Sequence, residues 1–289
     1  MKRKIRKRTL FKHFVLLGIF AIAAFALADT IMVNRFFVPH TFSYGDLSTR
    51  YIETEGTEDL PTLFFLHGAS VRAATYRDGL KMLAEKYHVV APDIPIPDGE
   101  IWDLLDYAKY FNQLLIEKDL RDIILIGHSF GGGISANLAN ITDRVEYLIL
   151  VDAVGVDIPE YSKEKNIEKA VGKLTGRMKR NSAITMVAMK DYIWNILNNI
   201  TSLDDVNNII FESLHKNYDY SNISAPTTIL WGGNENEDLI DEVIAFSLQK
   251  SIPGSELFFV GGGHDWPLYE YEKFVSMVDD ILDDYPGGL

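Results

Sequence analysis

One stretch, from Asp122 to Gly133 (DIILIGHSFGGG), places the strongest constraint on how this chain can fold. It begins with an apolar, mostly β-branched run over residues 123–126, which is typical of a buried strand. The run stops at Gly127, and small residues compatible with a helix follow over residues 134–140. The order strand, tight turn, helix predicts one unit of a parallel sheet that is covered by helices.

The turn reads Gly127-His128-Ser129-Phe130-Gly131, which is the G-x-S-x-G spacing of a nucleophile elbow. Glycine is needed at both ends because a side chain there would collide with the crossing of strand and helix. We therefore expect Ser129 to be held in a strained conformation and pushed out at the carboxyl end of the strand. The backbone N–H of Phe130 opens the helix, where it can stabilise a developing oxyanion. The alternative is a glycine-rich turn that carries a serine by coincidence.

Composition excludes several kinds of site. The 289 residues contain no cysteine, so disulfides, thiolate metal sites and cysteine nucleophiles are excluded. There is no His-Glu-x-x-His motif, and the glycines at 131–133 lack the dinucleotide-binding spacing, so we expect no metal and no cofactor. From Asp29 onward the chain carries 21 basic and 41 acidic residues, which argues against nucleic acid as a partner.

The N-terminus has a different charge pattern. Seven of the 28 basic residues lie in the first twelve positions, and residues 14–28 are uncharged. This pattern fits a secretory signal cleaved after Ala28. Continued to Val33, the same segment is long enough for an uncleaved membrane anchor, which we favour slightly over the cleaved signal. A buried core helix is the alternative to both. Either targeting role predicts that the chain after residues 1–33 lies outside the cytoplasm, anchored in the membrane or secreted.

Strand-like and helix-like segments alternate along the rest of the chain. The expected strands are 46–53, 62–66, 89–91, 123–126, 145–151, 227–231 and 257–260, and the expected helices include 76–87, 102–118 and 134–140. This alternation predicts an α/β fold, with a mostly parallel sheet, helices on both faces and ligands at the carboxyl ends of the strands.

Residues 155–222 interrupt the alternation with helical patterns near 161–174, 184–198 and 204–216. We interpret them as a helical cap inserted into a core formed by residues 46–154 and 223–285. The first part of the cap is basic, with Lys163, Lys165, Lys169, Lys173, Arg177, Lys179 and Arg180. Because Glu160, Glu164 and Glu168 are interspersed, a solvated helix face is the favoured explanation, and contact with an anionic membrane surface is the other.

Over residues 60–282 the chain resembles the α/β hydrolase superfamily. The features that carry the resemblance are His67-Gly68, the Gly127–Gly131 elbow, the segment PTTILWG at 226–232 and Gly263-His264. The resemblance implies the chain order nucleophile, acid, histidine, with His264 as the general base. The chemistry of serine also requires a general base such as His264, because a serine hydroxyl needs an imidazole to take its proton near pH 7.

The resemblance also implies roles for three supporting groups. His67 matches the structural histidine beneath the oxyanion loop, and His128 matches a supporting residue of the elbow. The backbone N–H of Ala69 is the expected second oxyanion donor beside that of Phe130. The chain departs from its relatives after Asp93, where IPIPDG replaces a glycine-rich turn, so we expect a short and stiff pocket rim.

The acid that orients the histidine is open among four residues. The position four residues after Trp231 usually holds aspartate in this superfamily, and here it holds Glu235, which we prefer. Counting back from Ile252-Pro253-Gly254, a landmark before the last strand, favours Glu237 instead. Asp238 is the next choice after Glu237. Asp152, at the end of the strand over 145–151, is a further candidate because some relatives carry the acid there.

The predicted function is that of a serine hydrolase with Ser129, His264 and Glu235 as its triad. We expect it to cleave an ester or similar acyl bond of a small apolar substrate through an acyl-enzyme, with the membrane as a partner of the N-terminal segment. A peptidase, a carbon–carbon hydrolase or a lyase would use the same triad. From a different class, the fold would bind a small ligand or a partner without catalysis.

Overall fold

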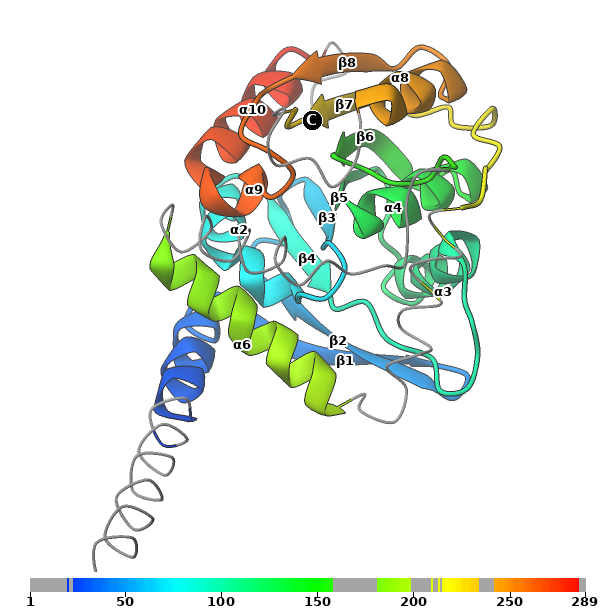
Figure 1. Ribbon diagram of the computed structural model, residues 1–289. Coiled ribbons are helices and arrows are strands. Elements are labelled where there is room, and N and C mark those ends of the chain that lie inside the picture. The colour runs from blue at the N-terminus through cyan, green and yellow to red at the C-terminus, as the bar shows by residue number, and fades with distance from the viewer. Residues whose placement is uncertain are drawn as a thin grey trace, which may run out of the picture.

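The computed structural model of this chain describes residues 20, 23–157, 181–198, 209, 213, 215–233 and 242–285. Its described residues form an eight-stranded sheet with the order β1-β2-β4-β3-β5-β6-β7-β8. The strands are β1 (Val38–Tyr44), β2 (Leu47–Glu53), β3 (Thr62–Leu66), β4 (His88–Pro92), β5 (Ile123–His128), β6 (Val145–Val151), β7 (Thr227–Trp231) and β8 (Glu256–Phe259). The pairs β1–β2 and β2–β4 are antiparallel, and all other neighbouring strands are parallel (Figure 1).

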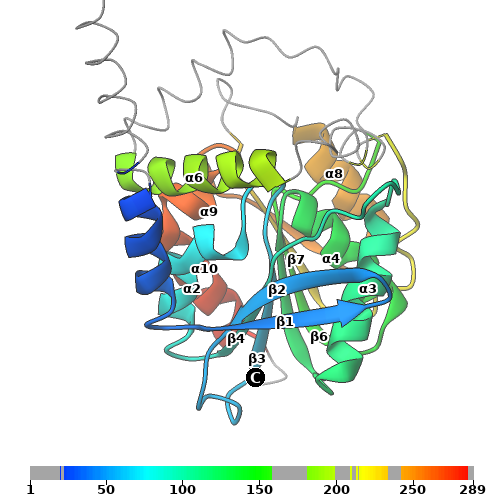
Figure 2. The same cartoon turned by 90° about the horizontal axis from the view of Figure 1, so that it is seen from below.

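The central strands are apolar on both sides because each side packs against helices. In β3, Phe64 and Leu66 pack into one core cluster, whereas Leu63 and Phe65 pack into the other. The first cluster includes residues of α3 (Leu104–Glu117), α4 (Phe130–Ile141) and α8 (Glu242–Ser251). The second includes residues of α2 (Arg77–Leu83), α9 (Trp266–Tyr269) and α10 (Tyr271–Asp283). These two groups of helices lie on opposite sides of the sheet in Figure 2, which confirms the predicted α/β fold.

Strand β1 was not predicted from the sequence. The first expected strand was 46–53, but β1 precedes it, forms a hairpin with β2 and pairs Tyr44 with Leu47. Gly45 enters the turn with φ +61°, a conformation that glycine adopts without strain. Phe42 is buried in the core from β1, so the hairpin covers apolar surface as well as the sheet edge.

The described residues of the insertion include α6 (Ser182–Asn198), which agrees with the helix expected at 184–198. The other expected helices lie outside the described residues, apart from 209, 213, 215 and 216. At the other end of the chain, residues 23–33 form a helix, here called the N-terminal helix, which lies beside α6 in both views (Figures 1 and 2). Within the part of the chain that the structure describes, no helix has the length and apolar character needed to cross a membrane.

Candidate active site

The elbow forms where β5 meets α4. Ser129 lies between them with φ +54° and ψ −116°, a strained conformation for a residue with a side chain. Its backbone N–H donates to the Val151 carbonyl at 2.9 Å, and its carbonyl accepts from the amide of Gly133 at 3.1 Å. A Cβ atom on Gly127 would lie 2.5 Å from the carbonyl oxygen of Gly131, which is too close for any side chain. The two glycines of the motif are therefore required by close backbone contact.

His264 meets Ser129 from the loop that follows β8. Its Nε2 atom lies 2.9 Å from the Ser129 Oγ atom, although 135 positions separate the residues. Three consecutive glycines precede the histidine, and all have positive φ: +67° at Gly261, +106° at Gly262 and +74° at Gly263. Such a run of left-handed backbone is available only to glycine at low cost, so the sequence Gly-Gly-Gly-His delivers the ring to the serine. Both Ser129 and His264 are only partly buried, which leaves room for a substrate.

The structure describes one of the four candidate acids. Glu235, Glu237 and Asp238 lie outside the described residues, whereas Asp152 directly follows β6. The Asp152 carboxylate is 2% exposed, and one of its oxygens lies within 4.8 Å of a ring nitrogen of His264.

Two donors hold that carboxylate in place. Oδ1 of Asp152 accepts from the amide of Gly232 at 2.8 Å, and Oδ2 accepts from the indole N–H of Trp266 at 2.8 Å. Asp152 also has a positive φ of 44°, which marks a position where the backbone is constrained. A buried carboxylate that is fixed in this way can orient an imidazole and stabilise its charged form.

His128 occupies the centre of the site in its neutral form. Its Nε2 atom lies 2.8 Å from the backbone carbonyl oxygen of His264, so Nε2 is the protonated donor. Its Nδ1 atom is then an acceptor, and it lies 2.6 Å from the hydroxyl of Tyr76. The same hydroxyl accepts from the amide of Gly68 at 3.3 Å. Burial lowers the pKa of His128 to about 3, which agrees with a neutral ring.

This chain of hydrogen bonds has two consequences. It connects the backbone of His264 to the loop after β3 through a rigid buried ring. It also occupies both nitrogens of His128. His128, Asp152 and His264 each offer a ligand atom within 4.8 Å of the others, but a cation bound by either nitrogen of His128 would have to replace the hydrogen bond that this nitrogen makes.

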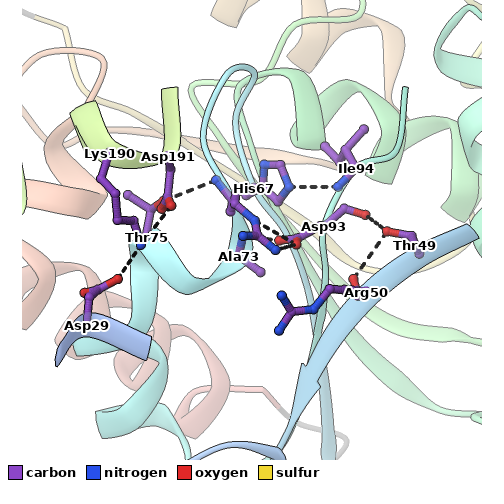
Figure 3. A network of polar contacts seen from close by, with 11 residues as sticks. Asp29, Thr49, Arg50, His67, Ala73, Thr75, Asp93, Ile94, Lys190 and Asp191 are labelled. Carbon is purple, nitrogen blue, oxygen red and sulfur yellow. Dashed lines mark hydrogen bonds and ion pairs between the residues drawn. The ribbon is translucent and has the colours of Figure 1, made fainter. Parts of the chain in front are cut away.

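The loop after β3 carries Ala69, the expected second oxyanion donor. A Cβ atom on Gly68 would lie 3.4 Å from Cβ of Ser129, so the loop backbone lies directly against Ser129. His67 fixes the start of the loop. Its Nε2 atom accepts from the amide of Ile94 at 2.8 Å (Figure 3), and its Nδ1 atom donates to the Gly68 carbonyl at 2.7 Å. Burial lowers the pKa of His67, so this ring is also neutral. The structure therefore places His67 in the supporting position that the resemblance implied.

Asp93 fixes the far end of the same loop, a role that the sequence analysis did not find. Its carboxylate accepts from the Ala73 amide at 3.0 Å and from Arg72, whose Nε and Nη2 atoms lie 3.0 and 2.6 Å away (Figure 3). Both Arg72 nitrogens donate to Oδ2, while Oδ1 accepts from the Ala73 amide, so each oxygen of the carboxylate has a donor. Asp93 follows a strand end in the sequence, but nothing in its spacing to Arg72 reveals the contact.

A second polar cluster joins this region to α6 and to the N-terminal helix. The loop continues into a short 3₁₀ helix, η1 (Ala73–Tyr76), where the Thr75 hydroxyl donates to Asp191 of α6 at 2.7 Å. The neighbouring Lys190 pairs with Asp29 of the N-terminal helix (Figure 3). Asp29 also pairs with Arg77 at 2.7 Å.

Comparison with known proteins supports the same fold. A model of the Alpha/beta hydrolase family matches residues 63–277. Uncharacterized proteins of Mycobacterium bovis and Mycobacterium tuberculosis are 30% identical to this chain over 103 residues, a stretch that covers 33% of this chain and 30% of each relative. The matched stretch thus spans about a third of the length of these curated relatives.

Two further matches extend over most of the chain. A Xenopus laevis protein named monoacylglycerol lipase abhd6-B is 22% identical over 275 residues, covering 83% of this chain and 80% of the relative. A solved structure described as a membrane phospholipase A superposes with a TM-score of 0.71 at 20% identity, covering 96% of this chain and 98% of that one. Because the family model matches residues 63–277, the chain belongs to the alpha/beta hydrolase family, and the strand order and the matched structure agree with this assignment.

Proposed function

We propose that this protein is a serine hydrolase that cleaves an ester, or a similar acyl bond, of a small apolar substrate. The observation that carries the proposal is the 2.9 Å distance between His264 Nε2 and Ser129 Oγ, where Ser129 lies in the turn between β5 and α4. A serine and an imidazole within hydrogen-bond reach are the diagnostic arrangement of an activated nucleophile. Esterases and lipases among the similar proteins point to acyl esters as the substrate class.

In the proposed mechanism, His264 Nε2 takes the proton of Ser129 Oγ as Oγ attacks the acyl carbon. The oxyanion that forms is stabilised by the backbone N–H groups of Ala69 and Phe130. The imidazolium then gives its proton to the leaving alcohol, and the acyl group stays on Ser129. Water, activated by the same imidazole, releases the acid and restores the serine.

For the acid we propose Asp152. Its support is the buried carboxylate within 4.8 Å of a His264 nitrogen and the two N–H donors that hold it. Glu235, preferred from the sequence, stays a rival prediction. Separate substitution of Asp152 and Glu235 tests this choice.

A fluorophosphonate probe tests the proposed activity directly. The wild-type protein is expected to become covalently labelled, and Ser129→Ala is expected to remain unlabelled while it keeps its fold by circular dichroism. Folded wild-type protein that does not react would overturn the proposal and favour the ligand-binding alternative. A series of nitrophenyl esters of increasing acyl length then measures the preferred substrate, and peptide substrates test for a peptidase.

A further inference from the structure

Helix α6 presents an apolar face to its surroundings. Its inner face is buried against the protein through residues that include Ile184, Val187 and Asp191. Its outward side chains are Met186, Met189, Tyr192, Ile193 and Trp194, all of which are exposed. A surface helix of a globular protein usually presents polar residues to water, and a contiguous apolar patch marks a contact with something else.

The N-terminal helix also carries exposed apolar residues. It contacts the body through Asp29 and Val33, both buried, while Leu27, Ile31 and Met32 are exposed on its other sides. The two helices lie beside each other in Figures 1 and 2, and the Asp29–Lys190 ion pair joins them. The exposed apolar residues of both helices are called the two-helix apolar surface, which comprises Leu27, Ile31, Met32, Met186, Met189, Tyr192, Ile193 and Trp194.

The flanking sequences indicate what covers this surface. Seven basic residues lie in the first twelve positions, just before the N-terminal helix. Residues 158–180, which lead directly into α6, contain seven basic and three acidic residues in a body where acidic residues otherwise predominate. Cations that flank apolar helices in the sequence are typical of segments that bind anionic lipid headgroups above an acyl interior. Tyr192 and Trp194 add the amphipathic aromatic rings that favour a membrane interface.

We propose that the two-helix apolar surface rests on an anionic phospholipid bilayer and that the enzyme takes its acyl ester from that bilayer. The second statement rests on the proposed function, whereas the first does not. On its inner side α6 contacts η1, because the Asp191 carboxylate accepts a hydrogen bond from the Thr75 hydroxyl at 2.7 Å. The loop that carries Ala69 continues into η1. Helix α6 therefore has the bilayer on its outer side and the loop that carries Ala69 close to its inner side.

Tryptophan fluorescence gives a local test. Trp194 is 54% exposed, whereas Trp231 and Trp266 are buried at 1% and 0%, and Trp102 is half-buried. The experiment uses the full chain with Ser129→Ala, so that hydrolysis does not alter the lipids. On addition of phosphatidylcholine–phosphatidylglycerol vesicles we expect a blue shift and quenching by brominated acyl chains. Both signals should be absent in a variant that also carries Trp194→Phe.

A pair of substitutions tests the consequence for catalysis. Met186→Ser with Ile193→Ser removes apolar side chains from α6, and Val243→Ser with Phe246→Ser removes two from α8 that are 64% and 55% exposed. We expect the α6 variant to hydrolyse a vesicle-borne ester about tenfold or more slowly, because each buried side chain contributes strongly to partitioning. Both variants should cleave a soluble short-chain nitrophenyl ester at the wild-type rate.

The outcomes separate the two proposals. If vesicles bind the protein but Trp194 emission stays unchanged, α6 faces water and the inference is wrong. If the emission shifts with protein concentration in the absence of lipid, a second copy of the chain covers the surface instead, and the inference is again wrong. If Trp194 responds to vesicles but the wild-type protein hydrolyses no ester and resists fluorophosphonate, the membrane contact stands and the proposed function fails.

Discussion

The hydroxyl of Tyr76 lies 2.6 Å from the Nδ1 atom of His128, which in turn donates from Nε2 to the backbone carbonyl of His264 at 2.8 Å. Through these contacts the loop after β3, the elbow and the histidine loop share one buried hydrogen-bond chain. In the proposed mechanism the two loops supply the oxyanion donor and the general base, and His128 sets their relative position. Catalysis in such a site depends on geometry that is fixed before the substrate arrives.

Replacing Tyr76 by phenylalanine is expected to lower kcat by about 10- to 100-fold, because small displacements of catalytic groups have effects of this size. KM should change little, since the substrate pocket itself is not altered. Steady-state kinetics on a nitrophenyl ester measures both values. Tyr110→Phe is the matched control, because Tyr110 is also buried but donates to the Leu47 carbonyl far from the site. Equal kcat values in Tyr76→Phe and the wild-type protein would contradict the positioning role.

Asp152→Asn tests the proposed acid against Glu235→Gln. We expect the asparagine variant to lose about 10³- to 10⁴-fold in kcat, because an amide cannot stabilise the imidazolium and favours the wrong tautomer. Glu235→Gln should then retain activity close to that of the wild-type protein. The reverse pattern would assign the acid to Glu235. Fluorophosphonate labelling rates measure the same difference without dependence on the substrate.

Local sequence patterns predicted much of the fold and the core of the site. The strand expected at 62–66 coincides with β3, and the strands at 145–151 and 227–231 coincide with β6 and β7. The elbow was predictable because its glycines, serine and flanking strand and helix are contiguous, so that spacing alone fixes the geometry. The hairpin of β1 was missed although Gly45 and Asp46 form a turn signal between alternating residues.

Other parts of the site depend on the order of the strands in space. Asp152 lies near His264 because β6 pairs with β7, which places the end of β6 beside Gly232 and the histidine loop. The contact between Tyr76 and His128 spans 52 positions, and neither residue type indicates in the sequence that the other is its partner. The anchoring of Arg72 and Ala73 by Asp93 has the same origin. Such contacts follow from tertiary packing, which single-residue patterns do not encode.

Asp29→Asn is expected to lower the free energy of unfolding by about 3 kcal/mol or more, because it removes the buried carboxylate that faces both Arg77 and Lys190. Chemical denaturation of the purified full chain measures the change. Lys109→Met is the control, since its partner Asp106 and Lys109 itself are exposed, and stability should hardly change. A result in which both substitutions have the same small effect would show that the N-terminal helix is not held by this pair.

The low pKa of His128 predicts how stability depends on pH. The ring has a pKa of about 3 in the folded protein because of burial, and an unfolded histidine has a value near 6.5. Above pH 6.5 the ring is neutral in both states, so its contribution to stability is complete and does not vary. Below that pH the unfolded chain binds a proton that the folded protein does not, so stability decreases as the pH falls toward 3.

Between pH 6 and pH 4 this single group is expected to reduce the free energy of unfolding by up to about 1.4 kcal/mol per pH unit. In His128→Gln the slope of unfolding free energy against pH should be smaller by that amount, since glutamine does not titrate. His67, whose pKa burial also lowers, is unchanged in the variant and contributes equally to both slopes. A direct measurement uses the imidazole NMR signals of the folded protein. The His128 resonance should stay at its neutral position down to pH 5, and a midpoint near 6.5 would contradict the buried neutral ring on which the positioning of His264 depends.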